Sequence, residues 1–284
     1  GLGRAYFQLE DYERAMENYR LANDKQGYSD AFRELSLLRV RANMGYILGG
    51  IVLFFILLKL YGNYRAKRRP SLEERRVRSL RPLRMPFTLM LHPYEGFDEV
   101  KSSGAGSVRV GIGIVGLLFL SMVISYVGTG FAFNHNRLER LNVFLLLGVS
   151  LGGFLLAYVS NLAVSSLMDD CEGRTGELFI VLSHALLPAI LARLVSVALS
   201  NLVNLEMGVF LNMLTSLGMM WSLVLLFMGL MQVNRLTFKR ALLNLLLTVV
   251  VLVIIAALLV LLYSLYQQIS VFFITMYNEV MFRI

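Results

Sequence analysis

The sequence predicts an all-α fold: a polytopic bundle of membrane helices preceded by a soluble helical hairpin. Of the 284 residues, 57% are hydrophobic and 16% are charged, whereas soluble domains are about 45–50% apolar. A helix needs about 20 apolar residues to cross a hydrocarbon core of about 30 Å. Six apolar runs reach or approach that length, at residues 45–61, 108–127, 143–167, 178–199, 208–231 and 241–265.

The charge distribution and the cysteine count narrow the functional classes. The net charge of +8 comes mainly from one linker, and a nucleic-acid-binding domain would instead combine basic and aromatic residues on a soluble fold. We therefore expect no nucleic-acid partner. Cys171 is the only cysteine, so the chain forms no internal disulfide. Because the sequence begins with Gly1 rather than Met, we expect further residues upstream.

Residues 1–43 predict soluble amphipathic helices in a pattern that resembles the tetratricopeptide repeat. Gly3 and Ala15 would let two antiparallel helices approach closely, Tyr6 and Tyr19 would fill the seam, and residues 9–12 would form the turn. A helical hairpin of no special type is the alternative. Since one repeat cannot bury its own face, either further repeats or a partner should cover it. The candidate partner-binding residues are Tyr6, Tyr12 and Tyr19.

Basic residues after the first apolar run predict the orientation. Residues 44–62 form the first predicted transmembrane helix, and residues 63–107 form an arginine-rich linker. Lys and Arg beside membrane spans stay in the cytoplasm, so residues 1–43 and the C-terminus should be extracytoplasmic. Arg137 and Arg140, in a loop that this scheme places outside, count against it. The linker could also contact anionic lipids; its candidate residues are Arg65, Lys67, Arg68 and Arg69.

The end of the linker predicts an interfacial helix, because Pro93 suits a first helical turn and Glu95 favours a helix N-terminus. The apolar residues expected to face the membrane are Phe87, Met90, Tyr94, Phe97 and Val100. The last span leads into an aromatic-rich tail, residues 266–284, which we expect to lie along the membrane interface.

Several of these features together resemble the prokaryotic Yip1-domain family. They are the Pro86-Phe87 segment, the five closely spaced apolar helices, the segment from Gly173 to Glu177, and Leu187-Pro188 in the following span. The resemblance covers about residues 86–284. It implies that residues 108–284 form a five-helix bundle entered from the cytoplasm. Together with the tetratricopeptide-like region, it implies a bacterial protein of the cytoplasmic membrane.

Motifs that could suggest cofactors or metals have simpler explanations here. The G-x-G-x-x-G pattern at residues 111–116 follows no strand and opens an apolar span, so close helix packing explains its glycines better. The same holds for the G-x-x-x-G pairs at residues 45–49 and 148–152, whose faces leave self-association open. The adjacent Asp169, Asp170, Cys171 and Glu172 cannot all point at one ion. We expect no cofactor, no metal and no catalytic residues.

Polar residues inside the spans are the sharpest candidates for function, because intramembrane ionisable groups are costly and usually face the bundle interior. His184 and Pro188 lie one turn apart, and Arg193 should approach the outer surface, where it reaches water or pairs with Glu206. Asn161 adds an amide. The candidate cluster of His184, Pro188, Arg193 and Asn161 would form a polar cavity, or would only join helices by hydrogen bonds.

The sequence therefore predicts a non-enzymatic membrane scaffold or adaptor that binds a protein partner through extracytoplasmic helical repeats and organises a membrane complex. The alternative is a transport or lipid-handling protein that uses a polar intramembrane cavity. An enzyme is disfavoured because Ser183 and His184 are neighbours on a helix and point about 100° apart.

Overall fold

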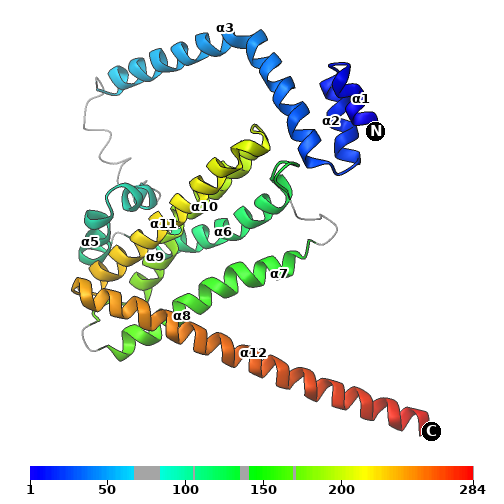
Figure 1. Ribbon diagram of the computed structural model, residues 1–284. Helices are drawn as coiled ribbons and strands as arrows, with labels where there is room; N and C mark the ends of the chain where they lie inside the picture. Colours follow the sequence, from blue (N-terminus) through cyan, green and yellow to red (C-terminus); the bar gives the residue numbers. More distant parts are fainter. Residues whose placement is uncertain (67–83, 105, 135–140, 169–170, 284) are drawn as a thin grey trace. The chain divides into compact units, whose positions relative to one another are not determined.

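The computed structural model describes residues 1–66, 84–104, 106–134, 141–168 and 171–283 (Figure 1). Within these ranges the chain forms helices and loops and no strand. Five helical segments are long and apolar enough to cross a membrane: Val108–Gly128, Val143–Leu167, Thr175–Ser200, Leu205–Val233 and Phe238–Met276. The all-α membrane fold is thus confirmed. The first apolar run, residues 45–61, continues helix α3, and most of its side chains lie outside the described residues.

The chain divides into two compact units. The first comprises Gly1–Pro86, Leu120–Val143 and Leu187–Ser222, and the second comprises Phe87–Phe119, Phe144–Leu186 and Leu223–Ile284. Helices α6 (Val108–Gly128) and α11 (Gly208–Val233) contribute residues to both. The division between α9 (Thr175–Ala185) and α10 (Leu187–Ser200) falls where the helix is interrupted at Leu186. Pro188 explains the interruption, because its ring cannot continue the hydrogen-bond ladder.

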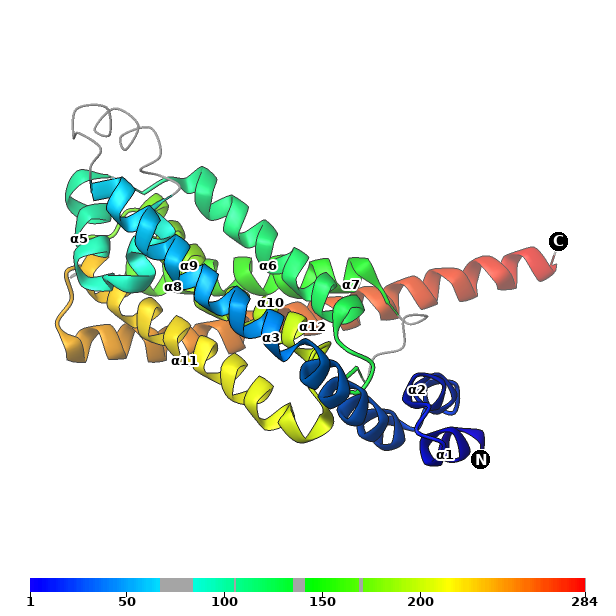
Figure 2. The ribbon, with the colours of Figure 1, turned by 90° about the horizontal axis from the view of Figure 1, so that it is seen from above.

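The first unit begins with the two predicted antiparallel helices, α1 (Leu2–Gln8) and α2 (Tyr12–Leu21), followed by the long α3 (Lys25–Ala66). We call α1, α2 and the start of α3 the N-terminal hairpin. Asp11 caps α2 by accepting a hydrogen bond from the backbone N–H of Arg14 at 3.2 Å, as short polar side chains at this position do. Ala15, Tyr19 and Ala31 form the buried core of the three helices. Figures 1 and 2 both show α1 and α2 side by side.

The second unit contains the predicted interfacial helix and most of the bundle. Residues 84–91 are helical, and α5 (Pro93–Ser103) follows with Pro93 in its first turn. Its predicted membrane-facing side is partly wrong. Phe97 and Val100 are 0% and 1% exposed, so they pack into the protein rather than against lipid. Gly104 ends α5 in the left-handed conformation, with φ of 60°, which glycine adopts without strain.

Helices α8 (Gly153–Leu167) and α12 (Phe238–Arg283) pack together in the second unit (Figure 1). Asn161 on α8 donates from Nδ2 to Asn244 Oδ1 and to Thr248 Oγ1 on α12, both at 3.0 Å. The 46 residues of α12 make a helix about 69 Å long, which runs away from α8 towards the C-terminus (Figure 2). The predicted interfacial tail thus continues the last membrane helix through Arg283 without a break.

The predicted glycine contacts are only partly present. A Cβ atom at Gly111 would lie 2.6 Å from Ser183 Oγ, so that glycine permits a close approach as predicted, whereas a Cβ at Gly113 or Gly116 would meet no atom within 4 Å. At the 148–152 pair the predicted packing within the chain is absent from the described residues, because a Cβ at Gly148 or Gly152 would meet no atom within 4 Å; self-association through this face stays a prediction. That segment forms a π-helical turn, η3 (Gly148–Gly152), between α7 (Val143–Leu147) and α8. Such turns interrupt α-helices as local bulges.

Candidate functional site

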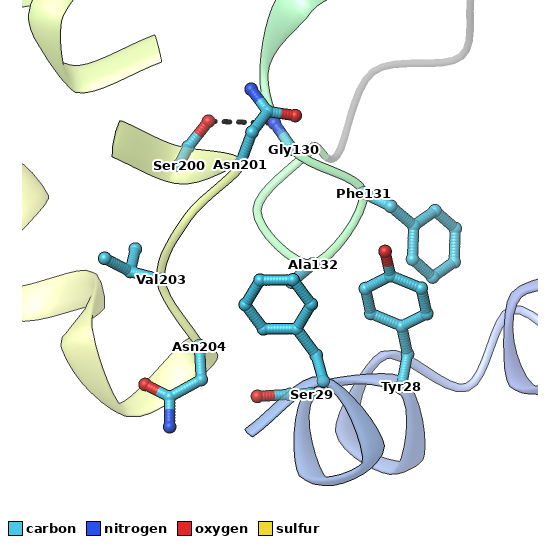
Figure 3. A pocket seen from close by; sticks show the side chains of 10 residues that line it. Tyr28, Ser29, Gly130, Phe131, Ala132, Ser200, Asn201, Val203 and Asn204 are labelled. Carbon is cyan, nitrogen blue, oxygen red and sulfur yellow. Dashed lines mark hydrogen bonds between the residues drawn. The ribbon is translucent and has the colours of Figure 1, made fainter. Parts of the chain in front are cut away.

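The start of α3 presents one face to two loops of the same unit. Residues spaced by three or four along a helix share a face, and the face here consists of Lys25, Tyr28, Ser29, Phe32 and Arg33. The loops are residues 129–134, after α6, and residues 201–207, after α10. We call this contact the docking site (Figure 3). It holds the N-terminal hairpin on the ends of membrane helices.

The first loop receives a charge-assisted hydrogen bond and an aromatic contact. Lys25 Nζ donates to the backbone oxygen of Asn134 at 2.8 Å. The rings of Tyr28 and Phe131 meet edge to face, with centroids 4.9 Å apart and planes at 66°. Arg20, on α2, places its guanidinium carbon 6.0 Å from the centre of the Phe131 ring. Phe131 thus contacts two helices of the hairpin.

The second loop is bound through its backbone and by one ion pair. Ser29 Oγ accepts a hydrogen bond from the backbone N–H of Leu205 at 2.9 Å, and Ser29 is almost fully buried. Arg33 Nη1 lies 3.1 Å from Glu206 Oε1. Both charged side chains are substantially exposed, so solvent screening limits this pair to about 0–1 kcal/mol.

The two loops are also tied to each other. Ser200 Oγ accepts a hydrogen bond from the backbone N–H of Gly130 at 2.8 Å and donates to the backbone oxygen of Val197 at 2.7 Å. Asn201 Nδ2 donates to the backbone oxygen of Gly128 at 2.8 Å. A Cβ atom at Gly130 would clash with the backbone oxygen of Ser200. These hydrogen bonds join the two loops to each other without any contribution from α3. The loops therefore form the surface that α3 contacts.

A small hollow lies inside the docking site (Figure 3). Its space for solvent is about 40 Å³, enough for roughly two or three water molecules. Asn204 Oδ1 is buried and accepts no hydrogen bond from any described residue. Water in the hollow would satisfy such an oxygen, as buried water commonly does. The lining residues are Tyr28, Ser29, Phe32, Gly130, Phe131, Ala132, Ser200, Asn201, Val203 and Asn204.

The three tyrosines predicted to bind a partner have different environments. Tyr6 and Tyr12 are half-buried on the hairpin surface, where Tyr12 packs edge to face on Phe7 with centroids 5.4 Å apart. Tyr19 is only 8% exposed and belongs to the hairpin core. Desolvation by burial, and secondarily the charge of Asp24, raises the pKa of its phenol. Tyr19 therefore stabilises the hairpin, whereas the predicted partner-binding role of Tyr6 and Tyr12 stays a prediction.

The predicted intramembrane cluster is not brought together by hydrogen bonds. His184 is buried, and its Nδ1 lies 2.8 Å from the backbone oxygen of Ile180, one turn earlier on the same helix. Its Nε2 has no partner among the described residues. Asn161 instead bonds to α12. Pro188 and Arg193 belong to the other unit.

The predicted Arg193–Glu206 pair is wrong: Glu206 pairs with Arg33, and Arg193 Nη1 is buried without a partner among the described residues. Of the predicted basic linker, Arg65 lies in the last turn of α3, and Lys67, Arg68 and Arg69 lie outside the described residues. Within the described ranges, no group of three His, Cys, Asp or Glu side chains could hold a metal ion.

A further polar cluster, which the sequence did not predict, lies at the ends of helices in the second unit. Lys101 Nζ on α5 lies 3.1 Å from Glu177 Oε2, and both side chains are largely buried. Asn234 Oδ1 accepts a hydrogen bond from the backbone N–H of Gly173 at 3.1 Å, and Arg235 pairs with Glu172 at 3.4 Å. In the sequence, the one indication of this cluster was Glu177, which lies in the first turn of a span, where a carboxylate can cap the helix. In the structure, Glu177 also accepts a hydrogen bond from the backbone N–H of Arg174.

Comparison with known proteins agrees with this architecture. The family model for the Yip1 domain matches residues 87–266, a range that includes α5 and the five candidate membrane spans up to the middle of α12. No curated protein and no solved structure gives a significant match. The family match covers more than half of the chain, so this integral membrane protein belongs to the Yip1 domain family.

Proposed function

We propose that this Yip1-domain protein is a non-enzymatic membrane adaptor. In this proposal the N-terminal hairpin binds a protein partner, and the docking site holds that partner beside the membrane bundle. The observation that carries the proposal is the attachment of α3 to the loops at residues 129–134 and 201–207 by hydrogen bonds, an aromatic contact and an ion pair. A hairpin joined only by a flexible tether would not fix a partner's position.

We further infer that α1 and α2 are a tetratricopeptide-type pair. The packing supports this inference: a Cβ at Gly3 would lie 2.8 Å from the Tyr19 ring, so the glycine permits the close approach of α1 to α2. Ala15 is fully buried beside the same ring. Leu9 and Leu21 are highly exposed on the hairpin and offer apolar surface to a partner or to a neighbouring repeat. With the charge rule for orientation, this hairpin lies outside a bacterial cytoplasmic membrane.

Photocrosslinking in native membranes tests the adaptor function. A photoreactive amino acid replaces Leu9 or Leu21 in the full chain, and exposed Ser102 on α5 is the matched control position. We expect the same protein adduct from both hairpin positions and none from Ser102. Adducts with lipid alone, or equal adducts from all three positions, would refute the adaptor proposal.

A further inference from the structure

We propose that helix α12 pairs in parallel with α12 of a second copy of this chain, along an apolar stripe that continues past the membrane. The residues of the stripe are spaced alternately three and four apart, so they lie on one side of the helix. They are Leu259, Leu262, Tyr266, Ile269, Phe273 and Met276. Their exposed fractions lie between 47% and 68%, so the described part of the chain does not bury this side of α12.

Helix α12 is longer than a bilayer requires. Its candidate span, Phe238–Met276, has 39 residues, whereas the span that packs against it, Val143–Leu167, has 25. At a rise of about 1.5 Å per residue, the longer span exceeds the shorter one by about 21 Å. Lipid that covers the shorter span therefore leaves the last turns of the longer one uncovered.

Contacts within the second unit show where α12 leaves the membrane. Asn161 lies six residues before the end of its span, Asn244 lies six residues after the start of its own, and the two side chains are hydrogen-bonded. The adjacent ends of the two spans are therefore at about the same depth. A path of 25 residues, the length of the shorter span, brings α12 to the opposite membrane surface near Leu262.

The side chains of α12 change character at that level. Tyrosine is enriched at membrane–water interfaces, and Tyr263 and Tyr266 lie there. Polar residues then follow, and none of them belongs to the stripe: they are Ser264, Gln267, Gln268, Ser270 and Thr275. Past the membrane, α12 is thus an amphipathic helix whose apolar side, from Tyr266 to Met276, needs a cover.

A second copy of α12 matches this stripe in direction, level and charge. Copies of one chain cross the membrane in the same orientation, so their α12 helices are parallel and each residue faces its own counterpart, as in an isologous interface. Such a pair is repulsive where the facing residues are charged. No charged residue occurs between Arg240 and Glu279. The charges by which coiled coils select a different partner are therefore absent from this stretch, and self-pairing is unopposed.

The stripe is also large enough for a specific interface. Tyr266 and Phe273 of two copies provide four aromatic rings, and each buried aromatic side chain covers about 150–250 Å². The rings alone account for about 600–1,000 Å², and specific interfaces bury about 1,200–2,000 Å² in total. The aliphatic side chains of the two stripes supply the remainder.

Disulfide crosslinking of the full chain in native membranes tests the pairing. Cys171→Ser removes the only cysteine. One new cysteine is then introduced on the stripe, by Ile269→Cys or Met276→Cys, or on the opposite side of the helix, by the matched control Val271→Cys. All three positions are exposed in the single chain. Two differently tagged copies are expressed together, so that a dimer with both tags contains two copies of this chain. Size-exclusion profiles confirm that each variant is folded.

We expect each stripe variant to give at least about fivefold more dimer with both tags than Val271→Cys, because a disulfide needs Cα atoms about 4.4–6.8 Å apart and only stripe positions of paired helices come so close. Equal yields from all three variants would indicate random collisions and would overturn the proposal. Absence of the dimer from both stripe variants would also overturn it, and would leave lipid as the cover of the stripe. Because the two stripe positions are tested separately, misfolding of one variant still leaves a decisive measurement.

Discussion

Replacing Ser29 by Ala should loosen the docking site without disturbing the hairpin. Ser29 is nearly fully buried, and its hydroxyl is the acceptor for the backbone N–H of Leu205 at 2.9 Å. Without that oxygen the half-buried N–H loses its hydrogen bond, which costs about 0.5–1.5 kcal/mol. At about 1.4 kcal/mol for each factor of ten, the ratio of docked to undocked hairpin falls about 2- to 12-fold.

Hydrogen exchange followed by mass spectrometry measures this change in the full chain. Peptides from residues 201–207 should exchange faster in Ser29→Ala, and so should peptides from residues 129–134, which contact the hairpin through other side chains. The matched control is Ser216→Ala, because Ser216 lies exposed on α11. Faster exchange restricted to Leu205 itself would mean that the loop, and not the hairpin, has moved. Unchanged exchange in both loops would refute the energetic role of Ser29.

The other predictions concern the ion pair, the α8–α12 contact and Tyr19. Arg33→Glu should make the free energy of docking less favourable by up to about 1 kcal/mol at low salt. Adding Glu206→Arg should restore the protection of the loops from hydrogen exchange. Absence of this rescue would exclude a direct ion pair. Asn161→Ala should destabilise the bundle by about 1–3 kcal/mol, because two interhelical hydrogen bonds are lost; a denaturant titration in mixed micelles measures this change. The exposed control Asn212→Ala should have little effect. Equal effects of the two substitutions would refute a special role of Asn161 in the α8–α12 contact. Because burial raises the pKa of the Tyr19 phenol, ionisation disfavours the folded hairpin. Its stability should be constant below the ordinary phenol pKa of about 10 and fall as the pH rises from there through the folded pKa. Proteolysis of the hairpin should follow this profile, and Tyr19→Phe should abolish the tyrosine-dependent part.

Features that depend on local sequence were predictable. The apolar runs marked the membrane helices because length and hydropathy are properties of one segment. Pro93 marked a helix start because the geometry of a first turn depends on only three or four residues. The hairpin seam followed from small and aromatic residues at helical spacing, and Tyr19 is indeed its central residue.

Features that depend on distant segments were not predictable. The side of α5 that faces the protein could not be identified from hydropathy, because lipid-facing and protein-facing positions are equally apolar in a membrane protein. Phe97 and Tyr94 therefore looked alike, although only Phe97 is buried. For Glu206 the sequence offered Arg193, the nearest basic residue, as one of two alternatives, whereas its partner Arg33 lies 173 residues away. The sequence of α3 did not indicate which loops its faces contact.

The energies at the docking site bear on how an adaptor of this kind could work. Each contact is modest: about 0–1 kcal/mol for the exposed Arg33–Glu206 pair, about 0.5–1.5 kcal/mol for the Tyr28–Phe131 edge-to-face contact beyond its buried area, and about 1 kcal/mol for a typical hydrogen bond. Such contacts together hold the hairpin docked most of the time. A partner present at about one hundred times its dissociation constant stabilises the state that it binds by about 2.7 kcal/mol, which is comparable with these contacts taken together. A partner that binds Tyr6 and Tyr12 does not compete with the loops for α3, so the hairpin stays docked. A partner that needs Tyr28 must first displace the loops from α3. The position of a partner on the hairpin therefore decides whether binding tightens or releases the attachment to the membrane domain.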